Sequence, residues 1–149
     1  MTVVVAVDGS GASRTAIQLA AYEARCRQAG LVAVTAYRAE TQASAPAARP
    51  VGTLTTGAEV RVSAENALRD AVSDALGPDA ADVEFLIVAG PAGKAVVEAA
   101  RQASAELIVL ATRPGLSMLP GGVSQYVLRN ARRPVLMVPA SLDDDGLDV

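Results

Sequence analysis

Short, nearly uninterrupted apolar runs alternate along the chain with longer segments in which apolar residues recur every three or four positions. Five runs rich in Val, Leu and Ile predict buried strands, because a strand covered on both faces shows no polar–apolar alternation. They span residues 2–8, 31–37, 83–90, 106–111 and 134–139. The pattern therefore indicates a sheet that is covered on both faces.

The segments between these strands predict four amphipathic helices, since their apolar residues fall on one helical face. The residues with this spacing are Ile17, Ala20, Ala21 and Ala24; Val60, Ala64, Leu68, Ala71, Val72 and Ala75; Val96, Ala99, Ala100 and Ala103; and Val127 and Ala131. Gly30 is expected to end the first helix, and the sequence GPD at 77–79 the second. Segment 40–56 has no period and predicts a mobile loop.

Strands and helices alternate from the first run to the last, which predicts an α/β fold with a parallel sheet and right-handed crossovers. A chain of 149 residues with this alternation is expected to form a single domain over residues 1–140. Residues 141–149 are rich in Asp and are expected to form a short disordered tail.

Composition and charge exclude several classes of function. Because 16 Asp and Glu outnumber 13 Lys and Arg, the chain lacks the clustered cations that nucleic acid binding requires. It has no His, which excludes a Ser-His-Asp hydrolase. Nothing else supplies a general base beyond Asp8, so we do not expect an enzyme. Cys26 is expected to be a small buried hydrophobe, and Asp79, Asp82 and Glu84 a solvated edge. The chain shows no secretion signal and no membrane-spanning run, so we expect a cytoplasmic protein with no membrane partner.

A candidate binding site follows from the strand order that such a sheet would have. Open α/β sheets bind ligands at the carboxyl ends of strands, where the order reverses. In the order 3-2-1-4-5, this crevice lies between the first and fourth strands. Asp8 ends the first strand, and Thr112 and Arg113 follow the fourth. The fourth helix would point its N-terminus, from Gly121 to Ser124, at the same crevice, and such an end attracts anions.

Each of these residues also has a purely structural explanation. Asp8 with Ser10 can cap the first helix, and Gly121 and Gly122 can simply turn the chain. Only their predicted convergence favours a binding site. The sequence GSGASR at 9–14 lacks the third glycine of a dinucleotide fingerprint, and no Lys follows a glycine run as in a P-loop.

Three stretches of the chain resemble the universal stress protein family. They are VVVAVDGSGAS at 3–13, ELIVLATR at 106–113 and VSQYVLRNARRPVLMVP at 123–139. The resemblance extends over residues 2–139 and is most specific in the last stretch. It implies a Rossmann-like, five-stranded parallel sheet in the order 3-2-1-4-5, with helices on both faces.

The resemblance also implies a homodimer that pairs through the fifth strand. In this chain that strand contains Val135, Leu136, Met137 and Val138. An apolar edge strand of this kind promotes aggregation unless it is covered, which agrees with the implied dimer.

Many members of the family bind ATP through a glycine pattern: G-x-x-G, nine further residues, then G and Ser or Thr. The glycine amides and the hydroxyl hold the ribose and phosphates, while an Asp after the first strand and backbone near the end of the second hold the nucleoside. By resemblance, Asp8 fits that Asp, the backbone near Ala36 fits the adenine contact, and Gly121 fits the third glycine.

The rest of the glycine pattern is degenerate in this chain. Ala111 and Pro114 stand at the first two glycine positions, and Gly122 replaces the Ser or Thr. Only nine residues, 112–120, separate Ala111 from Gly121, where the family has twelve. Each lost hydrogen bond to a charged phosphate costs ~1.5–3 kcal/mol, so two losses predict affinity weaker by about 100-fold or more. Arg113 could offset part of this loss, or be a solvated surface charge.

Three hypotheses remain from the sequence. The favoured one is a dimeric, non-enzymatic stress-response module that binds ATP weakly or not at all. The alternative is an adenine-nucleotide (ATP) sensor, with slow ATPase activity at most, that uses the shortened loop differently. A carrier of another small ligand in the same crevice is the third. No cofactor is assigned with certainty, and ATP is the candidate.

Overall fold

The computed structural model describes residues 1–8, 12–38, 57–112 and 122–139. The predicted loop at 40–56 and the predicted tail at 141–149 lie outside the described residues. The strands are β1 (Thr2–Ala6), β2 (Gly30–Tyr37), β3 (Val83–Ala89), β4 (Ala105–Thr112) and β5 (Val135–Pro139). The helices are α1 (Ala12–Arg27), α2 (Gly57–Leu76), α3 (Ala92–Gln102) and α4 (Val123–Asn130), with a 3-10 helix, η2 (Gly77–Asp82), after α2.

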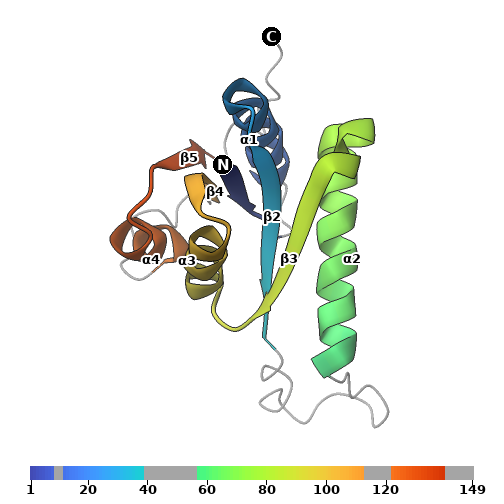
Figure 1. Ribbon diagram of the computed structural model, residues 1–149. Coiled ribbons are helices and arrows are strands. Elements are labelled where there is room, and N and C mark those ends of the chain that lie inside the picture. The colour runs from blue at the N-terminus through green and yellow to red at the C-terminus, as the bar shows by residue number, and fades with distance from the viewer. Residues whose placement is uncertain (9–11, 39–56, 113–121, 140–149) are drawn as a thin grey trace, which may run out of the picture.

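The strands form one parallel sheet in the order β3-β2-β1-β4-β5, which confirms the predicted fold class (Figure 1). The register between β1 and β4 shifts after Thr2, because Thr2 lies opposite Ala105 and Val3 opposite Leu107. Glu106 is therefore the extra residue of a bulge near the amino end of β4.

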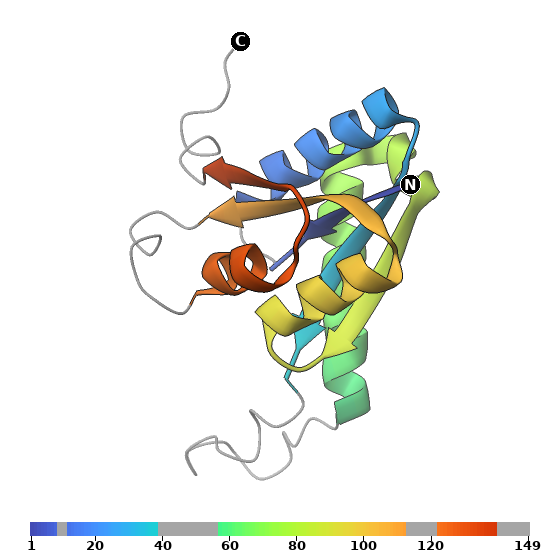
Figure 2. The ribbon, with the colours of Figure 1, turned by 60° about the vertical axis from the view of Figure 1, so that its left-hand side comes forward.

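Two helices cover each face of the sheet (Figure 2). Helices α1 and α2 pack on one face, where Ile17, Leu68 and Val72 are among the buried residues. Helices α3 and α4 pack on the other face, where Val96 and Val127 are buried. The layers follow from the sequence pattern, because each apolar helical stripe can be buried only against the sheet.

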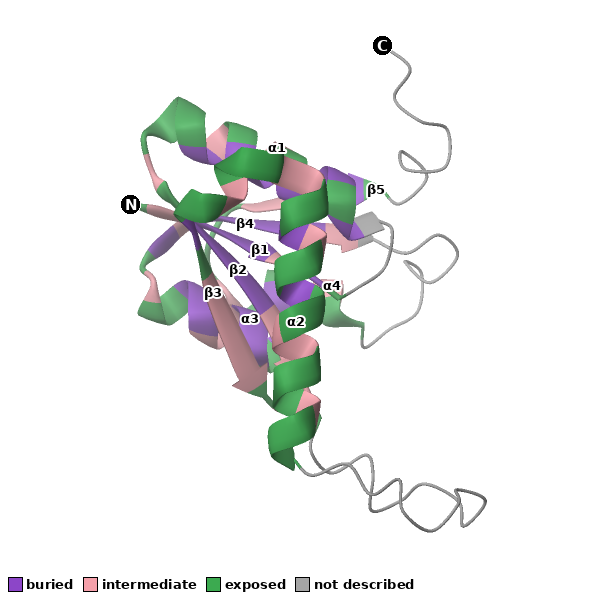
Figure 3. Ribbon diagram, turned by 90° about the vertical axis from the view of Figure 1, so that its right-hand side faces the viewer, coloured by how far each residue is buried: buried purple, intermediate pink, exposed green. Residues whose placement is uncertain are grey.

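Burial is deepest in the centre of the sheet and decreases toward its β3 edge (Figure 3). In β1, Val3, Val4 and Val5 have no exposed surface. Most of β3 is half-buried, and none of the first residues of α2, up to Ala67, is buried. The core therefore lies over β1, β2 and β4, the strands whose carboxyl ends frame the predicted crevice.

Three local predictions need correction. The first strand ends at Ala6 rather than Asp8, although the Val7 N–H still donates to the Val34 carbonyl at 2.9 Å. Helix α1 ends three residues before Gly30, where Gln28 adopts a left-handed φ of 53°. Cys26 is exposed, not buried, because it follows Ala24 by two positions and so faces away from the apolar stripe of the helix.

Candidate functional site

A small cavity opens at the carboxyl edge of the sheet, where β1 and β4 end. Its volume is about 90 Å³, and helices α1, α3 and α4 contribute residues to its wall. The lining residues are Ala6, Val7, Asp8, Ser13, Val34, Ala36, Ala92, Val96, Leu110, Ala111, Val123 and Ser124. We refer to this cavity as the crevice. It lies where the strand order reverses, as the sequence predicts.

The wall of the crevice is mainly apolar, with a few polar groups. Asp8 is the only ionisable side chain among the described lining residues, and the hydroxyls of Ser13 and Ser124 accompany it. Four alanines, Ala6, Ala36, Ala92 and Ala111, leave open space that larger side chains would fill. An apolar hollow with a few polar groups is typical of small-molecule sites.

Asp8 and Ser13 are joined by two hydrogen bonds. The Ser13 hydroxyl donates to Asp8 Oδ1 at 3.0 Å, and the Asp8 N–H donates to Ser13 Oγ at 3.3 Å. Asp8 is exposed, whereas Ser13 is only 1% exposed. Ser13 is the second residue of α1, so the Asp8 carboxylate lies near a helix N-terminus, where negative charge is stabilised.

Two further helices begin at the crevice without a side-chain cap. The N-cap residues are Pro91 for α3 and Gly122 for α4, and neither helix has a side-chain hydrogen bond at its cap. Ala92, Val123 and Ser124, the first residues of these helices, line the cavity. The crevice therefore faces backbone amides and the positive ends of helix dipoles, which suits a ligand that carries negative charge.

The crevice brings together three of the predicted site residues, Asp8, Ala36 and Ser124. Gly122 lies beside it as the N-cap of α4. Thr112 ends β4 one residue beyond the lining residue Ala111, with its backbone opposite Pro139. Arg113 and Gly121 lie outside the described residues, so their predicted contacts with a ligand stay predictions.

Sequence reasoning missed Ser13, Ala92 and Val123 as crevice residues. Ala92 and Val123 give no chemical signal, because they act only through shape and backbone. Ser13 did give one: it lies three and four positions before Ala16 and Ile17, so it is a hydroxyl on the buried face of α1. A polar residue in an apolar stripe needs a partner, and Asp8 supplies it.

A second cavity of about 260 Å³ lies at the amino ends of the strands, where β2 and β3 begin. Arg25, Asp79 and Asp82 line its rim. Arg25 and Asp79 form an exposed ion pair at 3.5 Å, which stabilises the fold little. Asp79, Asp82 and Glu84 are all exposed, as expected of a solvated edge.

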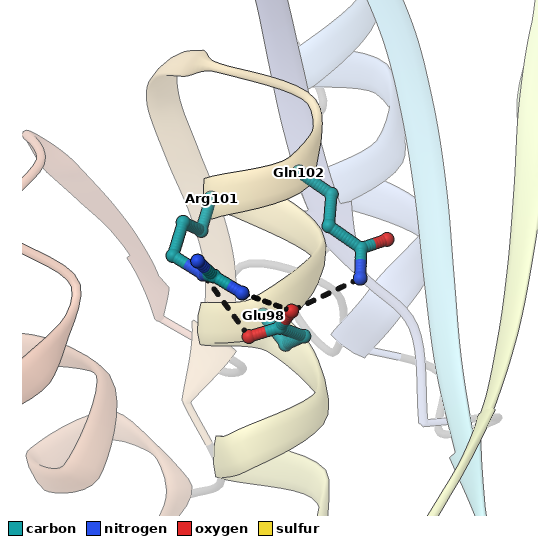
Figure 4. Close-up of polar contacts among 3 residues, drawn as sticks. All are labelled: Glu98, Arg101 and Gln102. Carbon is teal, nitrogen blue, oxygen red and sulfur yellow. Dashed lines mark hydrogen bonds and ion pairs between the residues drawn. The ribbon is translucent and has the colours of Figure 1, made fainter.

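The charged cluster on α3 is also a surface feature (Figure 4). Arg101 donates to both carboxylate oxygens of Glu98, at 2.6 and 3.2 Å, and Gln102 donates to Glu98 Oε1 at 3.0 Å. These hydrogen bonds lower the pKa of Glu98, so the small stability they add at neutral pH is lost as the pH falls through that lowered pKa. Nothing in this geometry requires a ligand.

Two negative findings apply to the described ranges. No group of three or more His, Cys, Asp or Glu side chains there could hold a metal ion. Within the same ranges, the helices are too short or too polar to cross a membrane.

Gly93 sets the distance between α3 and α4 next to the crevice. A Cβ at this position would lie 3.0 Å from Cβ, Cγ and Cδ1 of Tyr126. We expect Gly93→Ala to lower stability by about 1–3 kcal/mol through overpacking, and thermal unfolding measures this. Gly30→Ala is the matched control, because a Cβ there meets nothing within 4 Å. Equal melting temperatures for both variants would contradict the close α3–α4 contact.

Several solved structures of similar fold are universal stress proteins. A universal stress protein in complex with cAMP is 28% identical, with a TM-score of 0.61, and the match covers 94% of this chain and 97% of that one. Universal stress protein UspA from Lactobacillus plantarum is 24% identical, with a TM-score of 0.68, over 93% and 97% of the two chains. A universal stress protein from Archaeoglobus fulgidus in complex with dAMP is 22% identical, with a TM-score of 0.56, over 93% and 97%.

Among curated proteins, none matches this chain. The model of the universal stress protein family, by contrast, matches residues 1–139, which include every described strand and helix. This match agrees with the parallel sheet in the order β3-β2-β1-β4-β5 and with the crevice at its switch point. The chain therefore belongs to the universal stress protein family.

Proposed function

We propose that this protein is a non-enzymatic stress-response module whose crevice binds an adenine nucleotide weakly, with little contribution from the β- and γ-phosphates. The observation that carries the proposal is the convergence of Asp8, Ala36, Ala111 and Ser124 on one apolar cavity at the strand switch point. The family member 28% identical to this chain is in complex with cAMP, which supports an adenine mononucleotide as the ligand.

The crevice contains the groups that would hold the nucleoside part of such a ligand. The Asp8 carboxylate can accept hydrogen bonds from sugar hydroxyls, and the alanines of the wall leave room for a flat ring. The uncapped starts of α3 and α4 can donate to one phosphate. The cavity volume of about 90 Å³ is below the ~300–1,000 Å³ of sites that enclose a drug-sized ligand, which agrees with weak binding.

The part that would hold the outer phosphates is degenerate in sequence. Pro114 has no N–H to donate, Ala111 adds a Cβ where the family has glycine, and Gly122 lacks the hydroxyl of Ser or Thr. The segment is also shorter than the family pattern. These changes remove donors to the terminal phosphates but leave Asp8 and the end of β2 in place.

Calorimetric titration of the purified protein with AMP and with Mg-ATP tests this proposal. We expect weak binding of both, with affinities that differ by less than about tenfold, or ~1.4 kcal/mol. ATP binding that is tighter by about 100-fold would show that the shortened loop holds the outer phosphates and would favour the ATP-sensor alternative. Binding of neither nucleotide would overturn the proposal.

Asp8→Ala and Asp79→Ala form a matched pair for the same titration. We expect Asp8→Ala to weaken AMP binding about 10- to 100-fold, as for the loss of a hydrogen bond to a charged group. Asp79→Ala removes a carboxylate from the second cavity and should leave AMP affinity unchanged. Equal effects of both substitutions would contradict the crevice as the site.

We also propose that the protein forms a homodimer through β5. This strand pairs only with β4 among the described strands, and Val135, Leu136 and Met137 are half-buried within one subunit. A second copy that covers this edge would remove apolar surface from water and shield the edge from aggregation.

Leu136→Lys is expected to shift this dimer toward monomer, because a charge would be buried at the centre of the contact. Sedimentation velocity measures the change. Val62→Lys is the control, since Val62 is 54% exposed on α2. That helix packs on β2 and β3, on the side of the sheet away from β5. A monomeric unmodified protein, or a dimer that is indifferent to Leu136→Lys, would exclude this interface.

A further inference from the structure

We infer that Ser13 is a positioning residue for the ligand: it fixes the Asp8 carboxylate at the mouth of the crevice and so determines nucleotide affinity through Asp8. The inference rests on the proposed function, since it concerns the same site. The contact that carries it is the pair of hydrogen bonds between Ser13 Oγ and Asp8, at 3.0 Å to Oδ1 and 3.3 Å to the backbone N–H.

Asp8 needs such a support because of where it lies. It is exposed and comes two residues after the end of β1, so its side chain is not packed in the core. A carboxylate on the surface loses conformational freedom when a ligand binds, and this loss weakens binding. A partner that holds the carboxylate beforehand removes part of this cost.

Ser13 is suited to this role by its burial. It is 1% exposed, and the next turn of α1 is anchored in the core by Ala16 and Ile17, both with no exposed surface. Its hydroxyl therefore occupies a fixed position, and it donates its one proton to Asp8 Oδ1. Ser13 also lines the crevice, so a direct contact with the ligand is the competing explanation.

A double-mutant cycle on the full chain separates the two explanations. AMP affinity is measured for the unmodified protein, Ser13→Ala, Asp8→Ala and the double variant. We expect Ser13→Ala alone to weaken AMP binding about five- to tenfold, and to have no further effect in the Asp8→Ala background. A second loss of the same size in that background would show that Ser13 contacts the ligand directly and would overturn the inference.

Two controls exclude a merely structural role. Thr15→Val removes another buried hydroxyl of α1, one that does not line the crevice, and should leave AMP affinity unchanged. Ser13→Thr retains the hydroxyl and should recover most of the affinity that Ser13→Ala loses. Equal weakening by Thr15→Val and Ser13→Ala would mean that any disturbance of α1 has this effect, and would overturn the inference.

The same variants distinguish a failure of this inference from a failure of the proposed function. If Asp8→Ala weakens AMP binding and Ser13→Ala does not, the result supports the proposed function and refutes the role of Ser13. If the unmodified protein binds no AMP, both fall. Denaturant unfolding of the ligand-free unmodified protein and the three variants of the cycle then still reports whether Ser13 and Asp8 are coupled, and additive losses of stability would contradict the contact itself.

Discussion

A repaired loop is expected to raise the affinity for ATP by about 100-fold. The variant replaces residues 111–122 with a loop of the family length that has glycine at the first two pattern positions and Gly-Ser at the end. Two restored hydrogen bonds to charged phosphates at ~1.5–3 kcal/mol each account for a gain of this size. Asp8 and the end of β2, which the substitution does not touch, would receive the nucleoside.

Two controls belong with this loop variant. A loop of the same length that keeps the Ser but has alanine at the glycine positions separates the effect of length from the effect of close backbone approach. Asp8→Ala in the repaired background should lose most of the gained affinity. A repaired variant that folds and binds ATP no better than the unmodified protein would show that the crevice does not admit the nucleotide.

Ile108→Ala is expected to lower the free energy of unfolding by about 2–5 kcal/mol. Ile108 lies in β4, has no exposed surface and packs with Val96 and Val127 beneath α3 and α4. Its N–H also donates to the Pro134 carbonyl at 3.0 Å. The truncation would leave a cavity between the sheet and the two helices that frame the crevice.

Urea unfolding of Ile108→Ala and Leu128→Ala measures this cost. Leu128 is 56% exposed on α4, so its truncation should change the free energy of unfolding by no more than about 0.5 kcal/mol. A loss below about 1 kcal/mol for Ile108→Ala would contradict the central place of β4 in the core.

The fold could be predicted because nearly every strand is a continuous apolar run and every helix has a one-sided stripe. Ile17, Leu68, Val96 and Val127 were expected in the core and are buried there. Boundaries were less predictable, since tertiary hydrogen bonds decide them. For example, the Val7 N–H donates to the Val34 carbonyl of β2, although β1 already ends at Ala6.

Two predictions are wrong for the same reason, because residue type indicates less here than position along the helix. Gly30 was expected to end α1, but the left-handed residue at its end is Gln28. Cys26 was expected to be buried because cysteine usually is, but the helical period places it on the outer face of α1. Where period and residue preference disagreed at Cys26, period decided.

The candidate site was predictable in part, at Asp8 and Ser124 and, from the family resemblance, at Ala36. Asp8 and Ser124 were identified because they follow or begin elements that meet at the switch point, and the structure brings both to the crevice. The rest of the apolar wall was not identified, since residues such as Ala92 and Val123 differ in no chemical way from core residues. Ser13 could have been found from its place on the buried stripe of α1.

We propose the crevice between the ends of β1 and β4 as the nucleotide site. Amide chemical-shift mapping of the ¹⁵N-labelled protein with AMP tests it most directly. We predict that the largest shifts fall on crevice residues, with Ala36, Ala92, Ala111 and Ser124 among them. Shifts gathered instead around Leu76, Asp79 and Val83 of the second cavity, or no shifts at saturating AMP, would contradict the claim.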